Sequence, residues 1–389
     1  MKIFPRGIPD VNRLALRMLF GDQPKYIMLV CGLTFASLLM TQQTSVFCGL
    51  MIWTTSTVRN VRAKIWVVDP KVEQANEVRP LRDTDVNRVR TVPGVAWALP
   101  LFSAIVQAKL IDGTFQNVML MGLDSATLAG RPARMLRGSI EDLRLPNTVV
   151  IDVYGIEKLS RGHPKPIDIG DVFEINDKEA RIVGICIAER SFTGAPYVYT
   201  TYEKALNYAP KQRKMLSFVI AEPVPGADTA EVARRIASDT GLRTYTEDEF
   251  FWSTIWWYVY NTGIPVSFGT TIALGFIVGV AVSGQTFYTF ILENLRHLGA
   301  LKAMGASNWT LIQMVVLQAF TVGLLGYGIG VGLAAFFGYM VLDKGQPPFY
   351  MPPQLLIFTF VVTVLICSIS ALLGIRKVVM LDAAIVFRG

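Results

Sequence analysis

Four long apolar runs constrain this chain more than any other feature of its sequence. A helix needs about 20 residues to cross the roughly 30 Å hydrocarbon core of a membrane. We therefore expect transmembrane helices at residues 26–53, 264–290, 311–342 and 355–373. Residues 54–262 have an ordinary soluble composition and are long enough to bury a core of their own. The pattern predicts one span, a large outer domain and three further spans.

The distribution of charge predicts which side of the membrane each segment faces. Ten cations and four anions, which account for nearly all of the net charge of +7, lie in residues 1–25, 291–310 and 374–389. In the short outer loop, 343–354, Asp343 and Lys344 cancel. Cytoplasmic segments are enriched in Lys and Arg. We expect a multi-pass protein of the cell inner membrane, with both termini and the 291–310 segment in the cytoplasm and the large domain in the periplasm.

The outer domain has the pattern of a mixed α/β fold. A β-α-β unit is expected in residues 65–106 and is echoed in residues 217–247. Two such units make a small ferredoxin-like sheet, a porter subdomain, and residues 110–215 would be an inserted β-rich subdomain. Hairpins should turn at Asp112–Gly113 and Asn176–Asp177. The expected fold class is thus an α-helical four-span transmembrane domain with a large α/β extracytoplasmic domain.

Two aromatic or amphipathic segments flank the predicted spans. Residues 1–25 contain a helix with Arg13 and Arg17 on one face, expected along the inner membrane surface with its arginines near lipid phosphates. This helix is either a simple anchor or a lever packed beside the first span. Residues 250–265 are strongly aromatic. They form either an aromatic belt at the headgroup level or a wall that stacks against a substrate.

Polar and small residues inside the spans allow two interpretations each. Polar side chains in the first span either bond neighbouring helices or face a wet lumen. Glycines in the third span either permit tight packing within the subunit or form a dimer contact. The residues concerned are Thr41, Gln42, Gln43 and Thr44 in the first span and Gly326 and Gly330 in the third.

Several kinds of chemistry have no motif in this sequence. There is no P-loop for ATP, no acidic residue in mid-span suited to ion coupling, and no hydrolase or zinc motif. Of the two histidines, His163 is expected in a solvated turn and His297 on the cytoplasmic helix. We therefore expect no catalytic residue, no metal site and no bound cofactor, so the chain alone is not an enzyme.

The segment between the second and third spans carries the most specific motif. A charged, glycine-punctuated helix of about four turns is predicted there, over residues 291–310. The sequence GQTFYTFILENLRHLGALKAMGASNWTL, together with the layout of the spans, resembles the FtsX-like permeases of macrolide-exporter type. Its GQTFY and LGALKAMGAS phrases look most similar to DevC-type permeases.

The resemblance implies partners and a coupling role for this helix. Such permeases form homodimers and pair with a separate ABC ATPase, which binds the ATP and Mg. The motif carries over at Glu293, Leu298, Gly299, Leu301, Lys302, Gly305 and Ala306. Leu298, Leu301 and Met304 would fill a groove of the ATPase, and Arg296 and Lys302 would pair with its acidic rim. Gly305 would end or kink the helix.

The implied function is that of the permease subunit of an export complex. ATP hydrolysis by the partner would drive a change in the extracytoplasmic domain and efflux of a lipid, glycolipid or hydrophobic compound. A periplasmic membrane-fusion protein and an outer-membrane channel are the further partners expected, with membrane lipids and without nucleic acid. The alternative is an FtsX-like signalling subunit that regulates an extracytoplasmic enzyme without transport.

Overall fold

The computed structural model describes residues 8–21, 23–210, 215–342 and 347–379. The chain divides into two compact units, a helical domain (Met1–Gly49 with Gly263–Gly389) and an α/β domain (Leu50–Thr262). The predicted outer-loop residues Asp343 and Lys344 and residues 380–389 of the predicted 374–389 tail lie outside the described residues. Residues 374–379 of that tail belong to α12.

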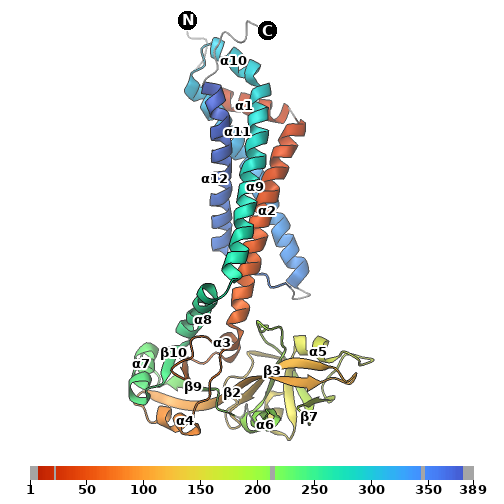
Figure 1. Ribbon diagram of the computed structural model, residues 1–389, viewed down its shortest axis with the longest axis vertical. Helices are drawn as coiled ribbons and strands as arrows, with labels where there is room; N and C mark the ends of the chain where they lie inside the picture. The colour runs from red at the N-terminus through yellow and green to blue at the C-terminus, as the bar shows by residue number, and fades with distance from the viewer. Residues whose placement is uncertain (1–7, 22, 211–214, 343–346, 380–389) are drawn as a thin grey trace. The chain divides into compact units, whose positions relative to one another are not determined.

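The described helical domain contains long helices and two shorter ones. Four helices are long and apolar enough to cross a membrane: α2 (Gln23–Thr54), α9 (Ile264–Glu293), α11 (Asn308–Leu342) and α12 (Pro353–Val379). The shorter helices, α1 (Ile8–Gly21) and α10 (Leu295–Ala303), lie towards the same end of this bundle (Figure 1). This agrees with the predicted four-span domain.

Glycines on α11 let its backbone approach α2 closely. A Cβ at Gly326 would lie 2.6 Å from the Leu33 Cβ, and one at Gly330 would lie 2.8 Å from the Thr34 carbonyl oxygen. Real Cβ atoms do not approach other atoms this closely, so only glycine fits at either position. The structure thus places Gly326 and Gly330 in packing within the subunit.

The α/β domain is organised around one sheet. Its strand order is β10-β1-β9-β2-β3-β8-β5-β7-β4, and β6 pairs with β2 and β7. The strands are β1 (Ile65–Val68), β2 (Val95–Lys109), β3 (Phe115–Leu123), β4 (Arg134–Gly138), β5 (Thr148–Asp152), β6 (Val172–Ile175), β7 (Lys178–Ile187), β8 (Tyr197–Thr201), β9 (Phe218–Pro223) and β10 (Arg243–Thr246). The helices are α3 (Ser56–Val61), α4 (Asp83–Arg90), the 3-10 helix η1 (Ile140–Arg144), α5 (Val153–Leu159), α6 (Tyr202–Tyr208), α7 (Thr229–Thr240) and α8 (Glu247–Asn261).

The first half of this domain has the predicted ferredoxin-like arrangement. Strands β10, β1, β9 and β2 are neighbours in that order, and every pair is antiparallel. Successive side chains of a strand point to opposite faces. Ile65 and Val67 therefore pack under α4 and α7, while Trp66 packs against Phe250 of α8 on the other face. Because both faces are covered, all four residues of β1 are buried.

The inserted half closes on itself. Strand β6 joins β2 to β7, so that β2, β3, β8, β5, β7 and β6 form a ring around a second apolar cluster. Asn176 and Asp177 have φ of 48° and 61°, as a two-residue hairpin turn requires. The predicted hairpin is therefore present. The predicted boundary near residue 110 does not separate the halves, since β2 runs unbroken through both.

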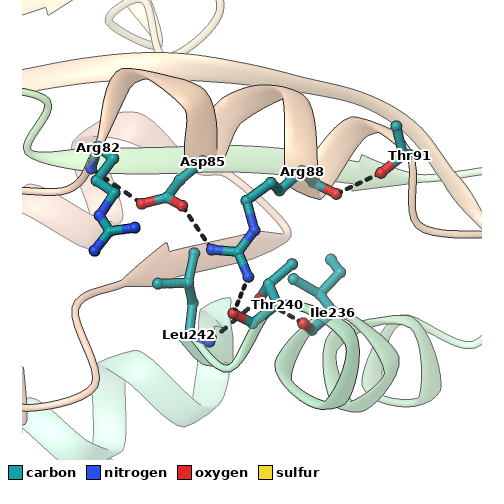
Figure 2. A network of polar contacts seen from close by, with 7 residues as sticks. All are labelled: Arg82, Asp85, Arg88, Thr91, Ile236, Thr240 and Leu242. Atoms are coloured by element: carbon teal, nitrogen blue, oxygen red, sulfur yellow. Dashed lines mark hydrogen bonds and ion pairs between the residues drawn. The ribbon is translucent and has the colours of Figure 1, made fainter.

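A polar network fastens α4 to the end of α7 (Figure 2). Buried Asp85 accepts hydrogen bonds from the Arg82 backbone N–H at 3.0 Å and from the Arg88 guanidinium at 2.8 Å. The same guanidinium donates to the Thr240 carbonyl at 2.5 Å, at the C-terminal turn of α7. Arg88 thus satisfies a terminal carbonyl of α7 while it is held by the first turn of α4.

Replacing Asp85 with Ala should destabilise the α/β domain by about 1–3 kcal/mol, because it removes an acceptor shared by two donors. Unfolding of the full chain in detergent, followed by circular dichroism, measures the loss. Arg79→Ala, which breaks an exposed ion pair with Glu77, is the control and should cost less than about 1 kcal/mol. Equal losses in the two variants would show that the Asp85 network adds nothing.

Replacing Gly330 with Ala should destabilise the helical domain by about 1–3 kcal/mol, because backbone atoms of α2 occupy the space of the new methyl group. Gly328, on the same helix, has no atom within 4 Å of an added Cβ. Gly328→Ala should therefore be neutral or stabilise by up to about 1 kcal/mol. Thermal unfolding in detergent compares the two, and a stable Gly330→Ala variant would contradict the packing.

Candidate coupling site

The Gly-Ala-Ser motif forms a tight turn between α10 and α11. Gly305 has φ of +99° and donates its N–H to the Lys302 carbonyl at 3.0 Å. Ala306 donates to the Leu301 carbonyl, also at 3.0 Å. These two bonds satisfy terminal carbonyls of α10 and define a Schellman ending with glycine in the left-handed position. Ser307 then accepts the Thr310 N–H at 3.1 Å and caps the start of α11.

The predicted helix of about four turns is therefore too long. Helix α9 continues to Glu293, and α10 has only nine residues, Leu295–Ala303. The chain changes direction at Asn294 and again at Gly305. Gly305 has the helix-ending role predicted for it. Ser307 was not identified from the sequence, although a serine two residues after a glycine stop indicates a new cap.

One side of α10 faces the chain's own core. Leu298 is 4% exposed and belongs to the apolar cluster of the helical domain, and Gly299 is also buried. Leu301 and Ala306 are half-buried and pack against the same cluster. Leu298 is therefore unavailable to fill a groove of another protein, contrary to the prediction. Its contacts within the bundle position α10 instead.

The outer side of α10 and the turn is exposed. Arg296, Met304 and Trp309 are open to solvent, with 57% of Met304 and 67% of Trp309 accessible. Trp309 lies in the first turn of α11 and was not among the predicted residues. A large aromatic residue beside a capping serine is the signal that would have found it. Met304 and Trp309 are thus exposed apolar side chains on either side of the Gly305 turn, and Arg296 is exposed near the start of α10.

Glu293 makes its contact inside the chain. Its carboxylate forms an ion pair with the Lys25 ammonium near the start of α2. Lys302, predicted to reach an acidic rim, is half-buried. Of the predicted residues, Glu293, Arg296, Met304 and Gly305 are exposed, and Glu293 is paired with Lys25.

The polar residues of the first span mostly make helix contacts. The buried Thr41 hydroxyl lies 3.5 Å from the Thr359 hydroxyl of α12. Thr44 donates to the Met40 carbonyl of its own helix at 2.8 Å. Gln42 and Gln43 are half-buried. Thr41 and Thr44 therefore favour helix bonding over a wet lumen at this level.

We call α3, which follows α2, and α8, which precedes α9, the two stalks of the α/β domain. Each stalk contacts other elements of this domain. The Tyr197 hydroxyl of β8 contacts Ser56 at 2.9 Å and Thr57 at 3.3 Å, both on α3. On α8, Thr254 accepts the Ala75 N–H at 3.0 Å, and Ser253 donates to the Glu73 carbonyl at 2.6 Å.

Phe250 of α8 packs on Trp66 and Tyr245 of the ferredoxin-like half. Asn76 connects the end of α2 to α8, because its amide donates to the Thr54 carbonyl at 2.7 Å and lies 3.4 Å from the Tyr258 hydroxyl. The inserted half therefore binds the chain that follows α2, and α8 contacts both halves, because Phe192 of the inserted half packs on Tyr258 with ring centroids 5.0 Å apart.

Comparison with known proteins gives the family. Residues 44–239 match the family of the MacB-like periplasmic core domain and span half of the chain. Residues 269–382 match the FtsX-like permease C-terminal family. The chain belongs to the FtsX-like, MacB-type permeases of ABC transporters.

Relatives of this permease cover most of its length. An uncharacterised ABC transporter permease of Mycobacterium bovis is 25% identical over 318 residues, 80% of each chain. The macrolide export ATP-binding/permease protein MacB of Bordetella avium is 25% identical over 337 residues, which are 80% of this chain and 49% of that protein. The periplasmic region of MacB from Actinobacillus actinomycetemcomitans covers 52% of this chain and 95% of its own at 13% identity, with a TM-score of 0.38.

Among the described residues, no group of three His, Cys, Asp or Glu side chains could hold a metal ion. The carboxyl group of Asp152, whose pKa is shifted, lies where the inserted half contacts α3. Asp152 accepts the Gly155 N–H at 2.5 Å and the Tyr197 N–H at 3.0 Å, next to the stalk contacts of Tyr197. Burial raises the pKa of Asp152 to about 7, although both N–H donors and Arg190 favour the carboxylate.

This pKa predicts a stability that depends on pH. The folded state binds a proton at Asp152 up to about pH 7, whereas in the unfolded chain this carboxyl loses it near its ordinary value of 3.8. The contribution of Asp152 to stability should therefore fall as pH rises from about 4 to 7. Asp152→Asn should flatten this part of the pH profile of unfolding in the full permease. Asp248→Asn, at an exposed carboxyl group, is the control and should leave the slope of stability against pH unchanged. An unchanged slope in Asp152→Asn would contradict the raised pKa of Asp152.

Proposed function

We propose that this permease is the membrane subunit of an ABC export complex powered by a separate ATPase. The observation that carries the proposal is the exposure of Met304 and Trp309 on either side of the Gly305 turn. Exposed methionine and aromatic side chains are typical of protein interfaces. Because the turn is closed by backbone hydrogen bonds and α10 is packed on its own bundle, a force on this surface is passed to the spans.

The two stalks support transmission to the α/β domain. Helix α2 continues to Thr54, within the α/β domain, and the inserted half forms hydrogen bonds with α3, which follows α2. The ferredoxin-like half packs against α8, which precedes α9. A movement of α2 relative to α9 would therefore act on the α/β domain through two separate sets of contacts. This favours mechanical export over passage of substrate through the helices.

The sequence of this chain contains no P-loop, so the ATP and Mg would be bound by the partner. The MacB relatives combine ATP-binding and permease functions by name, and this chain matches about half of their length. A homodimer of this permease, an ABC ATPase, a periplasmic membrane-fusion protein and an outer-membrane channel complete the proposed complex. Both termini would lie in the cytoplasm and the α/β domain in the periplasm.

The aromatic face of α8 supports a lipid, glycolipid or hydrophobic substrate. Phe250, Thr254 and Tyr258 are buried, while Trp252, Trp256 and Tyr260 occur at the same four-residue spacing and are 53%, 50% and 78% exposed. The Trp256 and Tyr260 rings stack with centroids 5.6 Å apart. Such a ladder offers apolar contact area with polar edges. It suits an amphiphile that leaves the membrane.

Met304→Asp should prevent recovery of the ATPase with this chain, because a charge replaces an apolar contact. The tagged chain is purified from its native membrane in mild detergent, and copurified proteins are quantified by mass spectrometry. We expect at least a tenfold loss, with export reduced in parallel. Leu301 is less suitable than Met304, since its substitution would also disturb the core.

Ile111→Asp, at a residue that is 66% exposed in the α/β domain, is the matched control and should leave ATPase recovery unchanged. Equal recovery with Met304→Asp would refute the coupling surface. If the ATPase copurified with a cell-wall hydrolase instead of a fusion protein, the chain would belong to the signalling alternative.

A further inference from the structure

Helix α1 is fixed to the third span. Ala15 and Leu19 are fully buried and belong to the apolar cluster of the helical domain. The buried Gln318 amide of α11 donates to the Ala15 carbonyl at 2.8 Å. Burying a glutamine side chain among apolar residues costs free energy unless its amide forms a hydrogen bond. Helix α1 is therefore a packed part of the bundle and not a loose tether, and its anchor is α11.

The other side of α1 carries two arginines between apolar residues. Arg13 and Arg17 are exposed and one helical turn apart, and among the described residues neither forms an ion pair. At 100° per residue they lie roughly opposite Ala15 and Leu19. Leu14 and Phe20, which are 40% and 45% exposed, flank them on either side. The exposed face thus combines two guanidinium groups with two apolar side chains.

The chemistry of this face fits an anionic phospholipid. Guanidinium groups bind phosphate through paired hydrogen bonds, and exposed Leu and Phe insert among acyl chains. Helix α1 ends at Gly21, and α2, a helix of membrane-spanning length, begins at Gln23. This continuity places a lipid leaflet beside α1. Basic residues near an anionic membrane surface are attracted to it.

We propose that Arg13, Arg17, Leu14 and Phe20 form a binding surface for anionic phospholipid, and that lipid bound there stabilises the packing of α1 on α11. The Gln318 contact provides the link. Helix α11 begins at Asn308, directly after the Gly305 turn. A lipid that holds α1 in place therefore also holds the helix that follows the exposed turn. The proposal is independent of any ATPase.

The test compares lipids and variants of the full chain. The chain is placed in nanodiscs of phosphatidylcholine alone or with one quarter phosphatidylglycerol, and its thermal unfolding is followed. Phosphatidylglycerol should raise the Tm of the unchanged chain by several °C. The Tm of Arg13→Gln/Arg17→Gln should be the same in both membranes, and native mass spectrometry should show about tenfold less retained phosphatidylglycerol.

Arg161→Gln/Lys165→Gln is the matched control, because it removes two exposed cations at the same spacing from the α/β domain. It should retain the full phosphatidylglycerol effect. Gln318→Leu should retain the bound lipid but lose most of the gain in Tm, and a full gain in this variant would overturn the link to α11.

Three results would overturn the lipid surface. The first is an undiminished phosphatidylglycerol effect in Arg13→Gln/Arg17→Gln. The second is equal stabilisation of the unchanged chain by soluble glycerol phosphate, which would indicate a phosphate site without a role for the acyl chains. The third is loss of a copurifying protein from the arginine variant with no change in lipid retention, which would make this face a protein contact.

Discussion

The connection between the two halves of the α/β domain depends on the backbone of one strand, β2. Strand β2 pairs with β9 up to Leu101 and with β3 from Phe102 onward. Where the partner changes, the Ser217 hydroxyl accepts the Ser103 N–H at 3.0 Å and donates to the Ser103 carbonyl at 3.2 Å. A cavity of about 330 Å³ lies beside this point. Because β2 belongs to both halves, a force applied to one half reaches the other through covalent bonds and ladder hydrogen bonds.

The contacts of α3 and α8 attach the sheet that contains β2 to the chain segments next to α2 and α9. Tyr197 holds α3 to the inserted half, and Phe250 holds α8 to the ferredoxin-like half. The two helices are thus attached through different residues of the domain, and Phe192 also joins the inserted half to Tyr258 of α8. In the helical domain, the backbone approaches at Gly326 and Gly330 and the Gln318 hydrogen bond similarly leave α1, α2 and α11 little freedom to move separately.

Patterns of periodicity and turn chemistry were readable from the sequence because they act locally. The span lengths, the Asn176–Asp177 hairpin, the two β-α-β units and the stop at Gly305 all follow from apolar run length, left-handed turn residues and strand alternation. The assignment of Leu298 to a partner was wrong because amphipathic spacing does not distinguish the side that packs on the chain's own core. The ion pair of Glu293 with Lys25 could not be read from local patterns either, since the two residues are distant in the sequence.

The sequence by itself determined that this chain spans a membrane, because about 20 consecutive apolar residues must be kept from water and each span bonds its own backbone internally. It also determined the ferredoxin-like pattern and the position of the exposed turn. Only the tertiary structure decided that α1 rests on α11, that β2 serves both halves, and that burial shifts the pKa of Asp152. These depend on contacts between residues far apart in the chain, which local patterns do not encode.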